Sequence, residues 1–243
     1  MLVALTDQNE VFQLTPSMTK TELQKIRQSI AFYCPQCKQL VQLKIGQINI
    51  PHFAHSKNNA CESGFSEGES QAHLLGKHQL FTFFQQRHFH TLLEPYLPAI
   101  KQRPDLLVSK GHHRYAIEFQ CSRISEEKCH DRSTGFLNVQ ITPIWLLKTP
   151  ATFKENGLVK LSINHFYQQF MQQQRGQSYL LTYDIESQHF YYVSNLMPIH
   201  GQQFLGDIQK IPLTQQIFPF YVPKRLTKNT YKMMLMRYQA FRN

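Results

Sequence analysis

Two short strand patterns between residues 103 and 120 constrain the fold of this chain more than any other feature. The segments Arg103–Val108 and Arg114–Gln120 are rich in apolar and β-branched residues, and Ser109-Lys110-Gly111 between them favours a turn. Asp105 lies near the start of the first segment and Glu118 near the end of the second. A hairpin about this turn would bring both carboxylates to one end, within reach of one divalent cation.

The surrounding residues predict the order helix, three strands, helix, strand. A helical apolar pattern runs from about Glu69 to Gln86, and His88–Glu94 has the composition of a strand that precedes the hairpin. A second helix is predicted from Ser125 to about Phe136, followed by a buried strand over Val139–Leu147. We therefore expect an α+β or α/β domain built on this segment.

This order, with Pro104-Asp105 and Glu118-x-Gln120, resembles the PD-(D/E)xK nuclease superfamily and its restriction-endonuclease-like core. The superfamily usually has Lys at the position of Gln120. A Lys can orient water and stabilise negative charge, whereas a Gln amide can only orient. Asp105 could instead be a plain turn carboxylate and Glu118 an edge-strand charge, although an unpaired charge between Ile117 and Phe119 would cost several kcal/mol.

One helix stripe carries further candidate groups. Glu69, His73 and Lys77 fall at i, i+4 and i+8 and share one face of the predicted helix. A solvated acid–base row would show the same spacing. The resemblance implies that Glu69 adds a third carboxylate to the cation, and we hypothesise that Lys77 replaces the missing superfamily Lys.

Residues 1–64 predict a small β-rich zinc knuckle. Cys34-x-x-Cys37 with Pro35 inside is a tight turn that aims two thiolates at one ion, and His55 and Cys61 follow a predicted hairpin of Val41–Ile45 and Gln47–Ile50. His52 is the alternative to His55. A redox pair lacks the preceding βαβ start that it would need, and an unmetallated set stays open.

Composition and charge indicate a folded protein with a polyanionic partner. Hydrophobic residues make up 42% and charged residues 17% of the 243, as in globular proteins. The formal net charge is +10, which suits nucleic acid or an anionic membrane surface. With no secretion-type start and no bilayer-length apolar run, five Cys favour reduced thiols or metal ligands, so we expect a soluble cytoplasmic protein without membrane insertion.

Several spaced motifs together resemble the competence protein CoiA family. They are Cys34-x-x-Cys37, His52-Phe53-Ala54-His55, Glu69-Ser70-x-x-His73-x-x-x-Lys77, Arg103-Pro104-Asp105, Glu118-Phe119-Gln120-Cys121-Ser122-x-Ile124-Ser125, Arg132-x-x-Gly135-Phe136 and Pro143-Ile144-Trp145-Leu146-Leu147. The resemblance covers about residues 30–148. It implies a zinc-finger-like N-terminal region, a nuclease-like domain, and a role in natural transformation of Gram-positive bacteria at the recombination stage.

The expected domains are residues 1–64, 65–149 and 150–243. In the last region we predict a Gln-rich helix over Leu161–Gln174, a hairpin of Ser178–Tyr183 with Gln188–Val193, and a terminal segment with six basic and no acidic residues after residue 223. Basic groups with interleaved aromatics suit single-stranded DNA, although an ordinary basic helix would have the same composition.

The function that we expect is a Mg2+- or Mn2+-dependent deoxyribonuclease with structural Zn2+ that acts on single-stranded or branched incoming DNA, with a recombinase as a candidate partner. The alternatives are a non-catalytic DNA-binding adaptor, which Gln120 favours, and a zinc-knuckle transcription regulator. We interpret Cys121 and Cys129-His130 as structural positions. The candidate catalytic residues are Glu69, His73, Lys77, Asp105, Glu118 and Gln120; the Mg2+ ligands are Glu69, Asp105 and Glu118; the Zn2+ ligands are Cys34, Cys37, His55 and Cys61; the DNA contacts are Arg103, Arg123, Arg132, Lys224, Arg225, Lys228 and Lys232.

Overall fold

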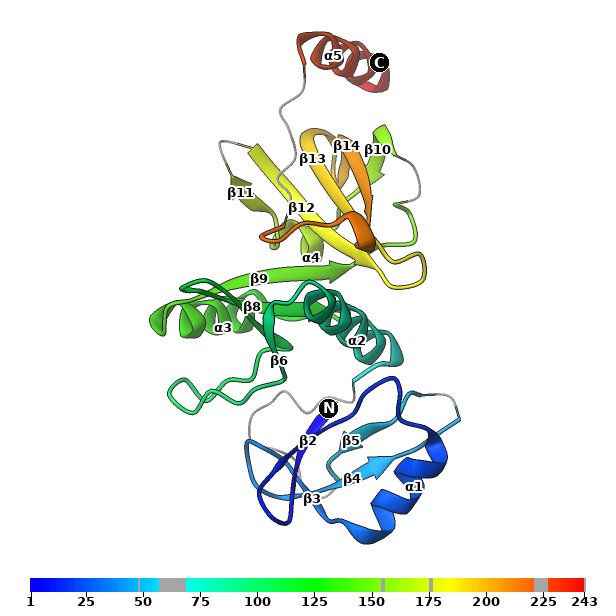
Figure 1. Ribbon diagram of the computed structural model, residues 1–243. Helices are drawn as coiled ribbons and strands as arrows, with labels where there is room; N and C mark the ends of the chain where they lie inside the picture. The colour runs from blue at the N-terminus through cyan, green and yellow to red at the C-terminus, as the bar shows by residue number, and fades with distance from the viewer. Residues whose placement is uncertain (48, 57–68, 154–155, 175–176, 221–226, 243) are drawn as a thin grey trace. The chain divides into compact units, whose positions relative to one another are not determined.

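The computed structural model describes residues 1–47, 49–56, 69–153, 156–174, 177–220 and 227–242 (Figure 1). Its contacts divide the chain into two compact units. The first unit comprises Met1–Cys121 and Glu127–Ile144, and the second comprises Ser122–Glu126 and Trp145–Asn243. Both units contain mixed α and β structure, which agrees with the expected fold class at that level.

The first unit begins with a five-stranded sheet in the order β2-β1-β3-β4-β5. The strands are β1 (Val3–Thr6), β2 (Val11–Gln13), β3 (Phe32–Tyr33), β4 (Leu40–Lys44) and β5 (His52–Ala54). The predicted strand Gln47–Ile50 is wrong, because β4 pairs instead with β5, in the register Leu43 opposite Phe53. Phe12, Phe32 and Phe53 pack their rings together in the core beneath these strands.

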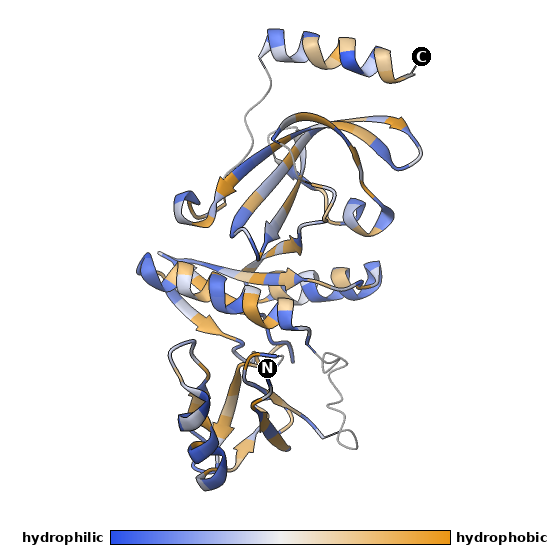
Figure 2. Cartoon of the chain, turned by 90° about the vertical axis from the view of Figure 1, so that its right-hand side faces the viewer, coloured by the Kyte–Doolittle hydropathy of each residue, from blue (hydrophilic) through white to orange (hydrophobic). Residues whose placement is uncertain are grey.

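A helix in this region, α1 (Lys20–Ser29), was not predicted from the sequence. Its signal is a capping box, in which the Thr19 hydroxyl accepts from the Glu22 amide and the Glu22 carboxylate accepts from the Thr19 amide. The apolar stripe is weak because Leu23 is its one buried residue, and Figure 2 shows a mostly hydrophilic helix. The capping box was therefore the stronger evidence in the sequence.

The rest of the first unit follows the predicted order helix, three strands, helix, strand. The elements are α2 (Gln71–Gln86), β6 (His90–Leu93), β7 (Leu106–Lys110), β8 (His113–Gln120), α3 (Glu126–Asn138) and the start of β9 (Ile141–Lys148). β7 and β8 form the predicted hairpin, with Leu106 opposite Ile117 and Gly111 at φ +59° in the turn. This left-handed backbone is one that glycine adopts without a steric penalty.

The two helices contact side chains on opposite faces of β8. Alternate side chains of a strand point to opposite faces. Phe119 lies against Gly76 of α2, where an added Cβ would stand 2.2 Å from the ring, while Ala116 packs with Phe136 of α3. Glu118 lies on the same face of β8 as Ala116. Whether a β8 side chain faces α2 or α3 therefore depends on its place in the alternation along the strand.

The second unit is built on antiparallel strands in the order β10-β14-β13-β12, and β12 also pairs with the end of β9 in parallel. Its elements are β10 (Gly157–Ser162), α4 (His165–Gln168), β11 (Gln172–Gln174), β12 (Gln177–Asp184), β13 (His189–His200), β14 (Gln203–Pro212), the 3-10 turn η1 (Leu213–Gln215) and α5 (Lys228–Arg242). The predicted hairpin corresponds to β12 and β13 and is confirmed.

The predicted helix over Leu161–Gln174 is wrong. Leu161 lies in β10 and pairs with Phe204 of β14, and Asn164 caps the short α4 by accepting from the Tyr167 amide. Pairing with β14 overrides the local helical pattern, because β14 comes some forty residues later and leaves no local sequence signal. No helix within the described ranges is both long and apolar enough to cross a membrane.

Candidate active site

The predicted stripe on α2 is a buried charge cluster rather than a solvated row. Ser70 caps α2 by accepting from the His73 amide, which orients the first turn. Lys77 is 0% exposed, and its ammonium group donates to the carboxylates of Glu69 and Glu94. Burial by itself would lower the pKa of Lys77, but Glu69, Glu94 and Asp105 raise it above its ordinary value, so the ammonium form is kept.

Asp105 joins α2 to the hairpin. Its Oδ2 accepts from the Phe119 amide at 2.8 Å and lies 3.0 Å from His73 Nε2, while its Oδ1 lies 3.8 Å from Lys77 Nζ. Burial acts to raise the pKa of Asp105, but His73 and Lys77 outweigh it and lower the pKa to about 2. The carboxylate is therefore ionised and held by three partners from two elements, α2 and β8, which a plain turn carboxylate would not be.

Glu69 lies next to both cations of the stripe. Its carboxylate accepts from Lys77 and from the Met1 amino group, and its Oε1 is 3.6 Å from His73 Nδ1. Burial acts to raise the pKa of Glu69, but Lys77 above all holds it well below the usual range. The position just before α2 thus supplies a second ionised carboxylate beside Asp105.

Glu118 occupies a different environment. Its carboxylate accepts from the Arg132 guanidinium of α3, and Arg132 also donates to the carbonyl of Arg103 at 3.1 Å. Burial raises the pKa of Glu118 to about 7, with Arg132 acting against that rise. Gln120 is half-buried two residues later at the end of β8. The expected awkwardness of a charge between Ile117 and Phe119 is resolved by a buried ion pair.

Glu94 is a functional candidate that the sequence did not reveal. It follows β6, is 2% exposed, and accepts from Lys77 and from the amides of Leu2 and Val3. These partners are distant in sequence, so no periodicity or short motif could have indicated them.

The donor atoms of Glu69, His73 and Asp105 lie within 4.8 Å of one another. Two carboxylates and an imidazole are a suitable ligand set for a divalent cation such as Mn2+, and the carboxylates alone suit Mg2+. The residues therefore fit a cation at this position. Glu118 is not in this group, because its side chain turns to the α3 face.

A second group of metal-binding side chains lies in the N-terminal sheet. Cys34, Cys37 and His55 present their ligand atoms within 4.8 Å of one another, and Cys37 Sγ is 3.9 Å from His55 Nε2. The S–N separation in a tetrahedral zinc site is about 3.5 Å. His55 Nδ1 is buried without a hydrogen-bond partner in the described part of the chain, and burial, together with Arg103, lowers the pKa of His55 towards the neutral, ligating form. These residues fit zinc.

Other predicted zinc residues lie differently. His52 Nδ1 is 2.9 Å from the Ile50 carbonyl, so His52 does not join the two cysteines, whereas His55 does. Cys61 lies outside the described residues. The group therefore contains three of the four ligands that the sequence predicts.

The predicted DNA-contacting side chains belong to both units. Arg132 is buried against Glu118, and Arg103 is half-buried beside Met1. Arg123 is exposed in the second unit, and Lys228 and Lys232 are exposed on α5. Lys224 and Arg225 lie outside the described residues.

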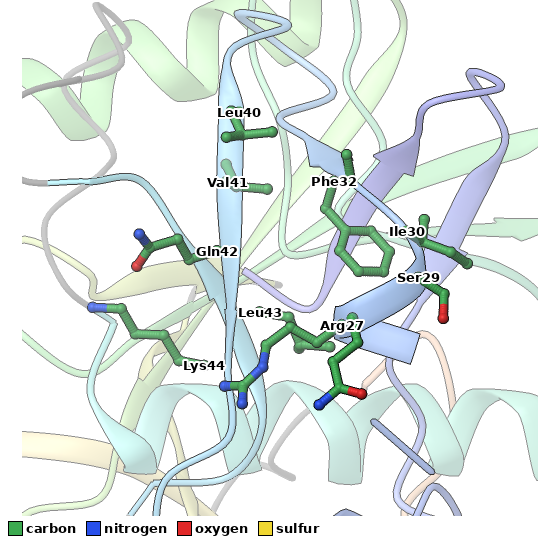
Figure 3. A pocket seen from close by; sticks show the side chains of 11 residues that line it. Arg27, Ser29, Ile30, Phe32, Leu40, Val41, Gln42, Leu43 and Lys44 are labelled. Atoms are coloured by element: carbon green, nitrogen blue, oxygen red, sulfur yellow. The ribbon is translucent and has the colours of Figure 1, made fainter. Parts of the chain in front are cut away.

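The N-terminal sheet also carries a pocket of about 530 Å³, whose lining side chains are drawn in Figure 3. It lies between the end of α1 and strands β3 and β4, and its lining is mainly apolar with Arg27 and Lys44 as basic members. None of the candidate metal ligands lines it. We therefore place the candidate chemistry at the carboxylate cluster and not in this pocket.

Two family models match the chain. Residues 15–64 match "Competence protein CoiA, N-terminal domain", and residues 69–225 match "Competence protein CoiA, nuclease-like domain". A similar curated protein is the competence protein CoiA of Bacillus subtilis (strain 168), which is 30% identical over 203 residues. That match covers 84% of this chain and 52% of the relative, so the chain spans about half of the relative's length. No solved structure matches the chain.

The nuclease-like family model spans more than half of the chain and contains Glu69, Glu94, Asp105 and Glu118. The N-terminal model ends beyond the Cys34, Cys37 and His55 group. The two site regions therefore fall one in each of the two matched domains. On these grounds the chain belongs to the competence protein CoiA family.

Proposed function

We propose that this protein is a metal-dependent deoxyribonuclease that processes incoming DNA during competence-linked recombination. The observation that carries the proposal is the position of the Asp105 carboxylate, between His73 of α2 and the Phe119 amide of β8. Glu69 and Lys77 complete the same cluster. The nuclease-like domain of the matched family and the competence name of the relative support this direction.

As part of the proposal, we assign the segment from α2 to β9 to the restriction-endonuclease-like PD-(D/E)xK fold. The order helix, three strands, helix, strand supports this assignment, as does the carboxylate pair at one end of the β7–β8 hairpin. Gln120 departs from the usual Lys.

Glu69 and Asp105, with His73 beside them, would hold Mg2+ or Mn2+, which would supply an activated water and neutralise charge on the phosphate. Glu118, at the end of the same hairpin, would join them on exchanging its Arg132 partner for the cation. Lys77 contributes a fixed positive charge 3.8 Å from Asp105 Oδ1, which is the charge that Gln120 lacks. Asp105 is held in its ionised form by His73 and Lys77, so it stays a ligand across the physiological pH range. Gln120 orients water by hydrogen bonding.

DNA is the proposed partner, in single-stranded or branched form, with a recombinase as a further candidate and the cytoplasm as the compartment. The net charge of +10 supports a polyanionic ligand. Lys228, Lys232 and Arg237 are exposed on α5, and the exposed Tyr231 lies on the same helix. Cations meet phosphates and aromatic rings stack on bases, so α5 has the composition of a DNA-contacting helix.

A non-catalytic DNA-binding adaptor is the second candidate. The observation in its favour is that Arg132 already engages the Glu118 carboxylate, while Gln120 replaces a Lys. In that case the charge cluster would stabilise the fold, and DNA binding would not depend on a divalent cation at this site.

The test is cleavage of single-stranded, duplex and branched DNA by the full chain with Mg2+ or Mn2+, with DNA binding measured in parallel. We expect wild-type cleavage, and a loss of about 100-fold or more in Asp105→Asn and Glu118→Gln with DNA binding kept. A wild type that binds but cuts none of these substrates would favour the adaptor. Unchanged cleavage by Lys77→Ala would exclude a role for Lys77.

A further inference from the structure

Glu94 combines two features that ordinary strand ends do not share. Its backbone is left-handed at φ +48°, a conformation that is strained for a residue other than glycine. Its carboxylate is buried at 2% exposure, where a charge is stable only with partners. The strained backbone and the buried charge occur at the same residue, so the partners of this carboxylate must compensate for both.

The two carboxylate oxygens of Glu94 have different partners. Oε1 accepts from the ammonium group of Lys77, and Oε2 accepts from the amides of Leu2 at 2.9 Å and Val3 at 3.3 Å. The backbone at the start of β1, at Leu2 and Val3, therefore holds one oxygen in place while the other faces Lys77. Glu94 is thus a fixed anion, and it does not belong to the group of candidate ligands Glu69, His73 and Asp105.

Lys77 has three carboxylate neighbours, and two of them are candidate metal ligands. Its ammonium group contacts Glu69 and Glu94 and lies 3.8 Å from Asp105. Without Glu94, the buried ammonium would be neutralised by Glu69 and Asp105 alone. A divalent cation would then compete with Lys77 for the same two carboxylates, because each carboxylate has only one unit of charge to share.

We propose that Glu94 is the counter-ion of Lys77 that balances part of its positive charge, so that Glu69 and Asp105, which also contact Lys77, bind a divalent cation more strongly. Glu94 is a positioning residue in this scheme, since it acts through Lys77 and does not touch the cation. The inference rests on the proposed function to the extent that both need a cation at Glu69 and Asp105. It adds that the strand β1 of the N-terminal sheet, which fixes Glu94, is part of the support of the site.

The test measures Mn2+ binding to the full chain without DNA, by electron paramagnetic resonance of free Mn2+. Glu94→Gln keeps the shape and the oxygen that accepts from the β1 amides but removes the charge, and we expect Mn2+ binding about tenfold weaker than in wild type. Adding Lys77→Met to that variant removes the competing ammonium, so we expect affinity to return to within about threefold of wild type.

Two controls separate this role from a general charge effect. Glu94→Gln combined with Lys101→Met restores the net charge at an exposed lysine, and its Mn2+ binding should stay weak. Glu127→Gln removes an exposed carboxylate of the same unit and should leave Mn2+ binding unchanged. Equal rescue by Lys101→Met, or no weakening in Glu94→Gln, would overturn the proposal.

Circular dichroism and urea unfolding check that each variant is folded. If Glu94→Gln does not fold, Glu94→Asp serves in its place, because it keeps the charge but moves the carboxylate away from Lys77 by the length of one methylene. Glu94→Asp should weaken Mn2+ binding, and adding Lys77→Met should restore it. If the wild type cleaves DNA and Glu94→Gln leaves Mn2+ binding unchanged, this inference alone is wrong. Wild type that binds Mn2+ with the expected rescue but does not cleave DNA would sink the nuclease proposal alone, and a wild type without Mn2+ binding would overturn both.

Discussion

Glu118 is a buried carboxylate whose protonation makes the stability of this fold depend on pH. It is 5% exposed in a strand between two fully buried apolar residues, and Arg132 is its ion-pair partner. Breaking such a pair by removing one partner usually costs about 3–5 kcal/mol, because the other charge stays buried. Arg132 therefore has a structural task that competes with the DNA contact expected for it, since its guanidinium is turned inward.

The pKa of Glu118 gives a signed prediction for stability. Burial raises its pKa to about 7 in the folded state, against an ordinary value of 4.5. Below pH 4.5 both the folded and unfolded states hold the proton, and between the two values only the folded state does, so the contribution to stability falls as pH rises towards 7. We expect the unfolding free energy of wild type minus that of Glu118→Gln, from urea titrations without metal, to fall from pH 4.5 to 7 and then level off. A difference that grows over this range would contradict the assignment.

Single-residue roles could be predicted where the local pattern was informative. Asp105 and Glu118 stood out because a carboxylate at the end of an apolar strand needs a partner, and the two ends meet in the observed hairpin. Glu94 could not be found in this way, because its partners Leu2 and Val3 are 91 or 92 residues away in the sequence. Tertiary packing likewise decides that Glu69 pairs with Lys77 of α2 while Glu118 pairs with Arg132 of α3.

Helix α2 owes its position to Gly76. The missing side chain lets the helix approach β8 so closely that a Cβ at Gly76 would stand 2.2 Å from the Phe119 ring. This approach brings His73 and Lys77, on the same helix, to Asp105. The close packing of α2 on Phe119 is therefore a condition for the cluster.

Replacement of Gly76 with Ala tests this packing. Ala is normally the better helix former by about 1 kcal/mol, but here the Phe119 ring is 1% exposed and would have to shift to admit a Cβ at Gly76. We expect Gly76→Ala to lower the unfolding free energy by about 1–3 kcal/mol and to weaken Mn2+ binding. Thr82→Ala, at an exposed position of the same helix, should be neutral or stabilising. A stabilised Gly76→Ala protein would show that α2 can shift without loss.

At the element level the sequence predicted the segment from α2 to β9 well and the flanking regions poorly. In the first case strong apolar periodicity and turn residues coincide, as at Gly111. In the second, β10 exists because it pairs with β14, and α1 has one buried residue to mark its face. Local patterns identify an element only when its own residues determine its partner.

On the scale of the first unit, the N-terminal sheet and the charge cluster are physically connected. The Phe53 amide of β5 donates to the Met1 carbonyl at 2.8 Å, and the amides of Leu2 and Val3 then bind Glu94. In the second ligand group, His55 directly follows β5, and Cys37 lies between β3 and β4 of the same sheet. Order in the sheet of residues 1–56 is thus linked by hydrogen bonds to the anion that pairs with Lys77.

Loss of the N-terminal metal group should therefore lower the stability of the first unit and weaken cation binding at the charge cluster. We expect the wild type to bind about one zinc ion per chain and Cys37→Ser to lose it, because three ligand atoms converge near Cys37. A small sheet gains much of its stability from such an ion, so Cys37→Ser should lower Tm by about 5 °C and also weaken Mn2+ binding through β1 and Glu94. Zinc content is measured by mass spectrometry and Tm by calorimetry, with Cys129→Ser on α3, outside both ligand groups, as the matched control. Equal zinc content in Cys37→Ser and wild type would refute the zinc site, while loss of zinc with unchanged Mn2+ binding would show that the sheet does not support the cluster.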